Sequence, residues 1–228
     1  MIIHPLTQVA IFTLILSQLL AAKLPGVEGT HAYPLYLMAG TLGWNLFVEI
    51  ISRFLNLFIE QANLLKKIHF PRMTLPVIVV GVCLINNLLL FLSILGIFAI
   101  MGHWPGPEVL WIPALMVPLV FLSAGLGLIL GIINVFVRDV GQVVPVILQI
   151  LFWLTPIVYP IATIPERYQK WLRFNPIYPI VNAYQEILVY GRIPHDFGVL
   201  VVALLGIFLV LVGLFLFRRA SPELVDAL

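Results

Sequence analysis

Residues 197–217 read FGVLVVALLGIFLVLVGLFLF, an apolar run of 21 residues without a charged side chain. A helix of about 20 apolar residues crosses the hydrocarbon core of a bilayer, so this run predicts a membrane span. The rest of the 228-residue sequence has a similar composition, because 62% of its residues are apolar and only 10% are charged. Soluble domains carry about 25% charged residues. The sequence therefore predicts a polytopic membrane protein and excludes a soluble one.

Five further stretches have the length and apolar character of a span, which predicts an all-α membrane protein with six transmembrane helices in a single domain, 1–228. The spans are expected at residues 2–22, 34–59, 74–101, 109–137, 140–160 and 197–217. A signal peptide is the alternative for the first stretch, but the basic n-region and the A-x-A-like cleavage site are missing. So much membrane-embedded chain leaves no room for a catalytic soluble domain.

The positions of Lys and Arg predict that both termini are cytoplasmic, because short cytoplasmic loops are enriched in these residues. The loop between the third and fourth spans contains neither residue. By parity of the six spans, seven of the twelve cationic residues lie inside and five outside. The inner ones are Arg53, Lys66, Lys67, Arg72, Arg138, Arg218 and Arg219, and the outer ones are Lys23, Arg167, Lys170, Arg173 and Arg192.

The segment 161–196 is too polar to span a membrane and too apolar for a plain loop. It predicts two short amphipathic helices. Thr163 and Glu166 have the spacing of a capping box at the start of the first helix. Gly191 is expected to end the second. Two arrangements stay open: a shallow re-entrant hairpin at the membrane interface, and a packed outer cap without moving parts.

Motifs for catalysis, metal binding and nucleotide binding are absent from the sequence. There is no P-loop, no nucleophile motif and no histidine pair with ligand spacing. The lone Cys83 excludes a disulfide framework, and a net charge of +2 does not suggest a nucleic-acid partner. We therefore expect no catalytic residues and no metal site.

Polar and small residues inside the spans are expected to act mainly in helix packing. Glu49 and Arg53 form an i,i+4 pair, which is either a structural ion pair or part of a water-filled path. Amides can hydrogen-bond between helices, and small residues four apart allow close helix approach. The amides are those of Asn86, Asn87, Asn134 and Gln149, and the small residues are Ser123, Gly127 and Gly131.

Several stretches together resemble the membrane subunits of type-2 ABC exporters, in particular those for O-antigen, teichoic-acid and capsular polysaccharides. They are GWNLF (43–47), ANLLKKIHFPRMTLP (62–76), NVFVRDVGQVVPVILQILFWLTPIVYP (134–160) and NPIYPIVNAYQEIL (175–188). Their order and spacing on the six predicted spans carry the resemblance, which covers about residues 5–195.

The resemblance implies a cytoplasmic coupling helix at residues 60–69 that fits a cleft on a separate ATP-binding subunit. It also implies a cytoplasmic hinge between the fourth and fifth spans. The plainer alternatives are lysines that only fix the topology and a local Arg-Asp ion pair. The implied coupling residues are Glu60, Leu64, Leu65, Lys66, Lys67, Ile68, His69, Arg72, Arg138 and Asp139.

The resemblance also identifies the two short helices, expected at residues 163–174 and 179–190, as extracytoplasmic gate helices. Aromatic side chains stack on the apolar C–H face of a sugar ring, so an aromatic lining suits a sliding glycan. An aromatic belt at the lipid interface is the alternative. The implied pathway and gate residues are Trp44, Phe47, Trp153, Tyr159, Tyr168, Trp171, Tyr178 and Tyr184.

Two features depart from the family pattern. The sequence starts at Met1 where the family's first span begins, so either the chain extends upstream or this member lacks the family's arginine-rich leading helix. Gln185 stands where the family often has Arg in the second gate helix, so no charged contact with substrate is expected there.

The function implied is that of a permease half-subunit that exports a lipid-linked polysaccharide across the inner or cytoplasmic membrane of a bacterium or archaeon. Its expected partners are a second copy of the chain, two copies of an ATP-binding subunit that bind ATP and Mg²⁺, and the lipid-linked glycan. No cofactor is expected in this chain. A type-2 ABC permease for a drug or lipid is one alternative, and a membrane-embedded glycosyl- or acyl-transferase is another.

Overall fold

A computed structural model describes residue 7 and residues 32–62, 73–194 and 196–227 of the chain. All regular elements within these residues are helical, as the composition predicts. The expected first span, 2–22, lies outside the described residues except for Thr7, and so does the expected coupling helix beyond Ala62. The elements are α2 (Ala32–Glu60), α4 (Thr74–Ile100), η1 (Pro107–Trp111), α5 (Ile112–Phe136), α6 (Val140–Leu154), η2 (Ile161–Thr163), α7 (Glu166–Arg173), α8 (Tyr178–Tyr190) and α9 (Phe197–Ala227).

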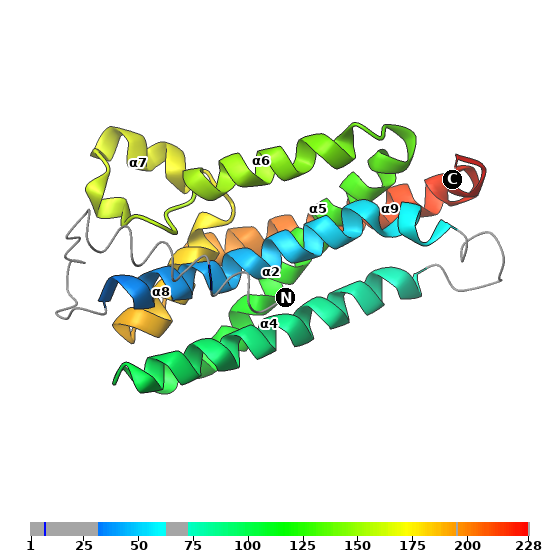
Figure 1. Cartoon of the computed structure of the whole chain (residues 1–228). Coiled ribbons are helices and arrows are strands. Elements are labelled where there is room, and N and C mark those ends of the chain that lie inside the picture. Colours follow the sequence, from blue (N-terminus) through cyan, green and yellow to red (C-terminus); the bar gives the residue numbers. More distant parts are fainter. Residues whose placement is uncertain (1–6, 8–31, 63–72, 195, 228) are drawn as a thin grey trace.

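Four of the helical stretches are long and apolar enough to cross a membrane: Ala32–Glu60, Thr74–Ile100, Pro107–Phe136 and Phe197–Ala220. They match the second, third, fourth and sixth predicted spans within a few residues, which confirms that the apolar runs are helices. All of them lie along the long axis of the molecule together with α6 (Figure 1). The described chain is therefore a bundle of membrane-spanning length.

The fifth predicted span is shorter as a helix than the apolar run from 140 to 160 suggested. α6 ends at Leu154, and Thr155 has an extended backbone with φ −95° and ψ 130°. Pro156 follows it, and a proline disfavours the helical conformation of the preceding residue. The prediction of a helix through residue 160 is wrong for this reason. Turns and the short helix η2 connect α6 to α7.

The core of the bundle is α2, of whose 29 residues 21 are buried. In Figure 1, α6 and α4 lie on opposite sides of α2, while α8 lies beside the N-terminal half of α2. In contrast, α9 exposes much of its apolar surface, including Leu204, Phe208 and Leu211. Such a surface fits a helix that faces lipid.

Glycines allow α5 to pack closely between α2 and α9. A Cβ atom at Gly127 would lie 2.8 Å from the Cβ atom of Phe54 in α2. On the other side, a Cβ atom at Gly125 would lie 2.6 Å from the backbone nitrogen of Val210 in α9. These distances are too short for a side chain, so the helices meet nearly backbone to backbone. The predicted packing role of the small-residue stripe in the fourth span is confirmed.

Buried amides connect the helices as expected. The Nδ2 atom of Asn87 donates to the carbonyl of Leu42 at 3.0 Å, which links α4 to α2. Asn134 of α5 donates in the same way to the carbonyl of Leu55 at 2.8 Å. Gln149 differs, because its side chain is exposed on α6.

The connection between α6 and α7 is fixed by hydrogen bonds from side chains of α2 and α8. The hydroxyl of Tyr33 donates to the carbonyl of Val158 at 2.9 Å. The hydroxyl of Tyr36 and the amide of Gln185 both donate to the carbonyl of Pro156, each at 3.2 Å. Gln185 is therefore a buried structural residue that holds this connection in place.

Candidate functional site

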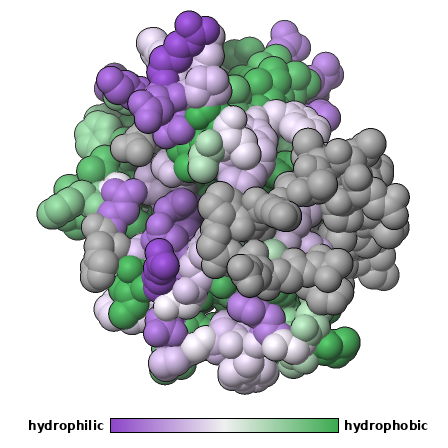
Figure 2. Space-filling model, turned by 90° about the vertical axis from the view of Figure 1, so that its left-hand side faces the viewer, coloured by the Kyte–Doolittle hydropathy of each residue, from purple (hydrophilic) through white to green (hydrophobic). Residues whose placement is uncertain are grey.

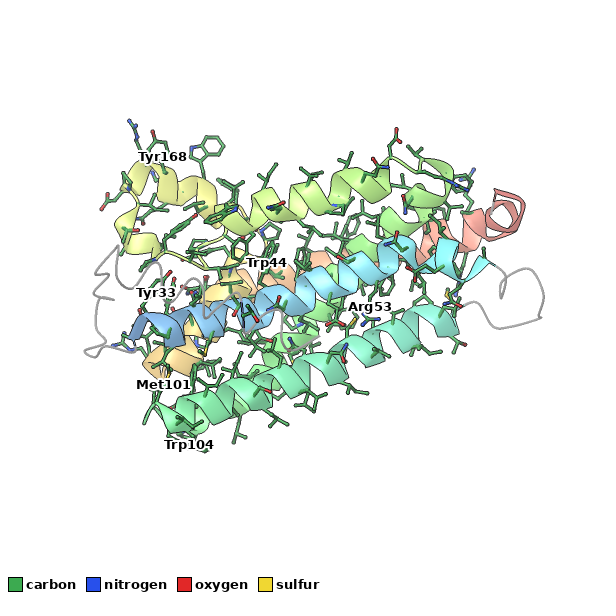
Figure 3. The ribbon with its side chains drawn as sticks, viewed as in Figure 1. Tyr33, Trp44, Arg53, Met101, Trp104 and Tyr168 are labelled. Carbon is green, nitrogen blue, oxygen red and sulfur yellow. The ribbon has the colours of Figure 1, made fainter. Side chains whose placement is uncertain are left out.

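A groove of about 330 Å³ lies between α2 and α6. On α2 it is lined by Trp44, Val48 and Ser52, which are spaced four residues apart and so share one face of the helix. The α6 side consists of Pro145, Leu148, Gln149, Phe152 and Trp153. In Figure 3, Trp44 lies on the side of α2 that faces α6. Two of the predicted pathway residues, Trp44 and Trp153, thus meet in one groove.

Three aromatic rings form one end of this groove. The ring of Trp44 lies edge-on to that of Phe152, with 5.5 Å between centroids. Phe152 in turn lies edge-on to Trp153 at 5.6 Å. Trp44 is only 7% exposed, whereas Trp153 is 52% exposed. The inner rings therefore hold the groove wall in shape, and Trp153 offers an open ring face.

The polar groups of the groove are Ser52 and Gln149. A hydroxyl and an amide provide hydrogen-bond donors and acceptors without a fixed charge. Such a combination of open aromatic surface and a few neutral polar groups suits a ligand with hydroxyl groups and apolar C–H faces.

Phe47 and Tyr159 lie close to the groove but do not line it. Phe47 is buried beside Trp44, with 5.8 Å between their ring centroids. The hydroxyl of Tyr159 donates to the carbonyl of Trp153 at 2.7 Å. Their positions support the groove wall and the exposed indole.

The two short helices expected after the fifth span are present, as α7 (Glu166–Arg173) and α8 (Tyr178–Tyr190). Gly191 ends α8 with a left-handed backbone, φ 58°, as predicted. The prediction of a capping box at Thr163 is wrong. The Thr163 hydroxyl donates to the carbonyl of Pro160 at 2.7 Å within η2, and Pro165 precedes α7 without a side-chain cap. That these helices act as a gate stays a prediction.

The aromatic residues of α7 are exposed. Trp171 is 75% exposed, and the guanidinium of Arg167 lies 4.4 Å from the ring centroid of Tyr168. Such a cation–π contact leaves the ring available on its other face. Figure 2 views this end of the bundle and shows hydrophilic and hydrophobic side chains next to each other at its upper edge, where α7 lies.

The aromatic residues of α8 are less accessible. Tyr178 is partly buried, and Tyr184 is completely buried. The Tyr184 ring packs against α2 at Gly43 of the GWNLF stretch, where a Cβ atom would lie 3.4 Å from the ring, an ordinary contact distance. α8 thus packs as a core helix, as the packed-cap alternative expects, while a position of α7 at the membrane interface stays a prediction.

The hydroxyl of Tyr184 is buried without a hydrogen-bond partner among the described residues. We expect Tyr184→Phe to leave the free energy of unfolding unchanged or to raise it by up to about 1 kcal/mol, because an unpaired buried hydroxyl is unfavourable. Tyr33→Phe is the matched control and should lower it by about 1 kcal/mol, since it removes the bond to Val158. Thermal unfolding in detergent measures both. An equal loss in the two variants would contradict the prediction.

The predicted intramembrane ion pair is present on the opposite side of α2, which faces α4 (Figure 3). The distance between Arg53 Nη2 and Glu49 Oε1 is 2.9 Å. Asn86 of α4 donates to the same carboxylate oxygen at 2.7 Å. The hydrogen bond between helices indicates a structural ion pair that holds α4 to α2, away from the groove.

The implied coupling residues are described only in part. Glu60 is the last residue of α2, and Arg138 and Asp139 are exposed between α5 and α6. No ion pair joins Arg138 or Asp139 to another described residue, so the local ion pair considered for them is not formed. The remaining coupling residues, Leu64, Leu65, Lys66, Lys67, Ile68, His69 and Arg72, lie outside the described residues.

Sequence reasoning assigned Gln149 to helix packing and missed the other groove residues, which are Val48, Ser52, Pro145, Leu148 and Phe152. The four-residue spacing of Val48 and Ser52 from Trp44 was a usable signal, since these positions share a helix face. Nothing in the sequence showed that this face meets α6, which is about a hundred residues away in the chain.

Comparison with known proteins agrees with this architecture. The chain is 25% identical over 228 residues to an O-antigen export system permease protein RfbA of Klebsiella pneumoniae, covering 100% of this chain and 85% of that protein. It is 26% identical to RfbA of Myxococcus xanthus, covering 99% and 84%. Over 109 residues it is 26% identical to the polysialic acid transport protein KpsM of Escherichia coli, covering 48% and 42%. The family described as ABC-2 type transporter matches residues 1–189, and the chain belongs to this family of multi-pass membrane proteins.

Proposed function

We propose that the chain is the permease half-subunit of an ABC exporter that moves a lipid-linked polysaccharide outwards across the inner or cytoplasmic membrane of a bacterium or archaeon. The cargo is an O-antigen, a capsular polysaccharide or a teichoic-acid-like polymer. The names of the relatives that match this chain over nearly its full length support this class of substrate.

The observation that carries the proposal is the groove between α2 and α6. Its exposed Trp153 ring and its neutral polar groups, Ser52 and Gln149, fit a sugar chain better than a charged solute. An aromatic face binds successive sugar rings with similar energy, so a polymer can slide without a deep energy well at any one position. The exposed aromatic residues of α7 offer further stacking surfaces for sugar rings at the end of the bundle where α7 lies.

The energy for transport comes from a separate ATP-binding subunit, because the sequence contains no P-loop. Two copies of that subunit bind ATP and Mg²⁺, and two copies of this chain form the pathway. Residues 60–69 contact the ATP-binding subunit, with Leu64, Leu65 and Ile68 as apolar contacts beside Lys66 and Lys67. Arg138 and Asp139 form the cytoplasmic hinge.

The proposed topology has six spans and two cytoplasmic termini. Residues 2–22 form the first span, and α6 with the turns that follow it forms the fifth. The ends of α2 and α5 near Glu60 and Phe136 then face the cytoplasm, while α7 and α8 lie at the outer surface. Closure of the ATP-binding dimer pushes residues 60–69, which tilts the spans and opens the outer end.

Trp153→Ala tests the groove. It is expected to slow polymer export about fivefold, because it removes a stacking surface with a value of about 1 kcal/mol. Trp153→Phe keeps a ring and should restore most of the export. The measurement is surface glycan per cell, with protein level and binding of the ATPase subunit recorded in parallel.

Trp104→Ala is the matched control, since Trp104 is also exposed but lies outside the groove. Normal export by Trp153→Ala, or an equal loss in Trp104→Ala, would contradict the groove as the pathway. Normal surface glycan in cells that lack the whole chain would contradict polysaccharide export itself and would favour a drug or lipid as cargo.

A further inference from the structure

Asn134 lies near the cytoplasmic end of α5 in the proposed topology and is only 2% exposed. Its Nδ2 atom donates to the carbonyl of Leu55 in α2 at 2.8 Å. Its Oδ1 atom is buried and accepts no hydrogen bond from any described residue. A buried amide whose nitrogen is hydrogen-bonded while its oxygen accepts no hydrogen bond is unusual.

The vacant half of this amide faces the first turn of α6. A Cβ atom at Gly141 would lie 2.9 Å from Asn134 Oδ1 and 3.2 Å from Nδ2, so a side chain at this position would displace the Asn134 amide. One side chain of α5 therefore touches both α2 and α6. It brings these two helices together at their inner ends, below the groove that they line.

In the proposed transporter, α2 leads to the contact with the ATP-binding subunit, and α6 leads to the groove. Leu55 lies five residues before Glu60, where α2 ends and the proposed ATPase contact begins. Gly141 lies about one helical turn before Pro145 and two turns before Leu148, and both of these residues line the groove. Asn134 thus lies between the proposed ATPase contact and the groove.

The first turn of α6 also has donors that can move. The N–H groups of Val140, Gly141 and Gln142 donate to carbonyls three residues earlier, at 3.1, 3.1 and 3.0 Å. Hydrogen bonds of this i to i−3 kind have poorer geometry than those inside an α-helix, so the N–H groups at a helix end change partners most easily. If this turn shifts so that one of these bonds opens, the freed N–H group becomes a donor for the Oδ1 atom of Asn134, which would give the contact a second arrangement.

We propose that Asn134 is a positioning residue that couples movement of the inner end of α2 to α6 and hence to the groove. The proposal rests on the proposed function, because it presumes an ATPase partner and an exported polymer. A residue in this role changes how much transport follows from each ATP hydrolysed, rather than the hydrolysis itself.

The test compares Asn134→Leu with Asn87→Leu in liposomes that contain the chain and its ATPase subunit. Asn87 is a close match, because it is also 2% exposed, donates to a carbonyl of α2 and has a vacant Oδ1 atom, but belongs to α4. We expect Asn134→Leu to keep ATP hydrolysis and to lower polymer exported per ATP about fivefold or more. Asn87→Leu should keep the unmodified ratio. An unchanged ratio for Asn134→Leu, or an equal fall in both variants, would overturn the proposal.

A second pair of variants decides the question if Asn134→Leu does not assemble. Gly141→Ala adds a methyl group against the Asn134 amide, whereas Gly81→Ala on α4 meets nothing within 4 Å. We expect only Gly141→Ala to lower the export per ATP, and Asn134→Ala in that background to cause little further loss. Equal ratios for Gly141→Ala and Gly81→Ala would overturn the proposal. Failure of the unmodified chain to export polymer would instead reject the proposed function, and the coupling role with it.

Discussion

Gly125→Ala is expected to lower the free energy of unfolding by about 3 kcal/mol or more, the upper end for overpacked cores. The added Cβ atom would lie 2.6 Å from the nitrogen of Val210 and 2.7 Å from the carbonyl carbon of Leu209. Both are backbone atoms of α9, which cannot move aside without displacing the helix. The measurement is unfolding of the purified protein in mixed micelles as the fraction of denaturing detergent is raised.

Two further variants separate this effect from a general cost of changing a glycine. Gly206→Ala tests a neighbouring contact between the same two helices from the α9 side, where a Cβ atom would lie 2.7 Å from the nitrogen of Leu122, and should be similarly unstable. Gly96→Ala adds a methyl group in open space and should be neutral or stabilising by up to about 1 kcal/mol, because alanine favours the helix. Similar midpoints for Gly125→Ala and Gly96→Ala would show that α5 and α9 do not pack this closely.

The combined change Leu65→Asp and Lys66→Glu is expected to weaken binding of the ATPase subunit about a hundredfold or more. In the proposed coupling helix it buries unpaired negative charge in a cleft, at a cost of about 3 kcal/mol or more. Stimulation of ATP hydrolysis and export should then disappear together. Co-purification of the two subunits and hydrolysis in liposomes measure the two effects.

The conservative pair Leu65→Met and Lys66→Arg is the control and should bind the subunit almost normally, because size, apolarity and charge are kept. If the charge-reversed variant still binds and stimulates the ATPase, residues 60–69 are not the coupling helix. Their lysines would then serve only to orient the chain in the membrane.

The spans were predictable because membrane insertion depends mainly on composition. The predicted spans at residues 34–59 and 74–101 agree within two residues with α2 (Ala32–Glu60) and α4 (Thr74–Ile100). The end of α6 was less apparent, since the apolar run continues past Pro156 while the backbone does not remain helical. Here a local proline effect overrides the hydrophobic pattern.

The site was predictable only in part. Trp44 and Trp153 were expected in the pathway from the family resemblance, and both line the groove. Tyr184 was expected there too, yet it is completely buried, because its ring packs against α2 at Gly43. Which face of a helix meets which neighbour depends on packing between distant segments, and a single sequence does not contain this information.

The short length of α6 has a consequence for the surrounding membrane. Its 15 residues reach about 22 Å, less than the hydrocarbon thickness of about 30 Å. In Figure 1, α6 ends well before α2 and α4 do, and the charged helix α7 lies beyond it. Any lipid that contacts the part of α6 outside the groove must adapt to this thinner apolar belt, at a cost that grows with each ångström of mismatch. We therefore expect export to depend on the acyl-chain length of the host bilayer, because that length decides how far the lipids must adapt to the end of α6.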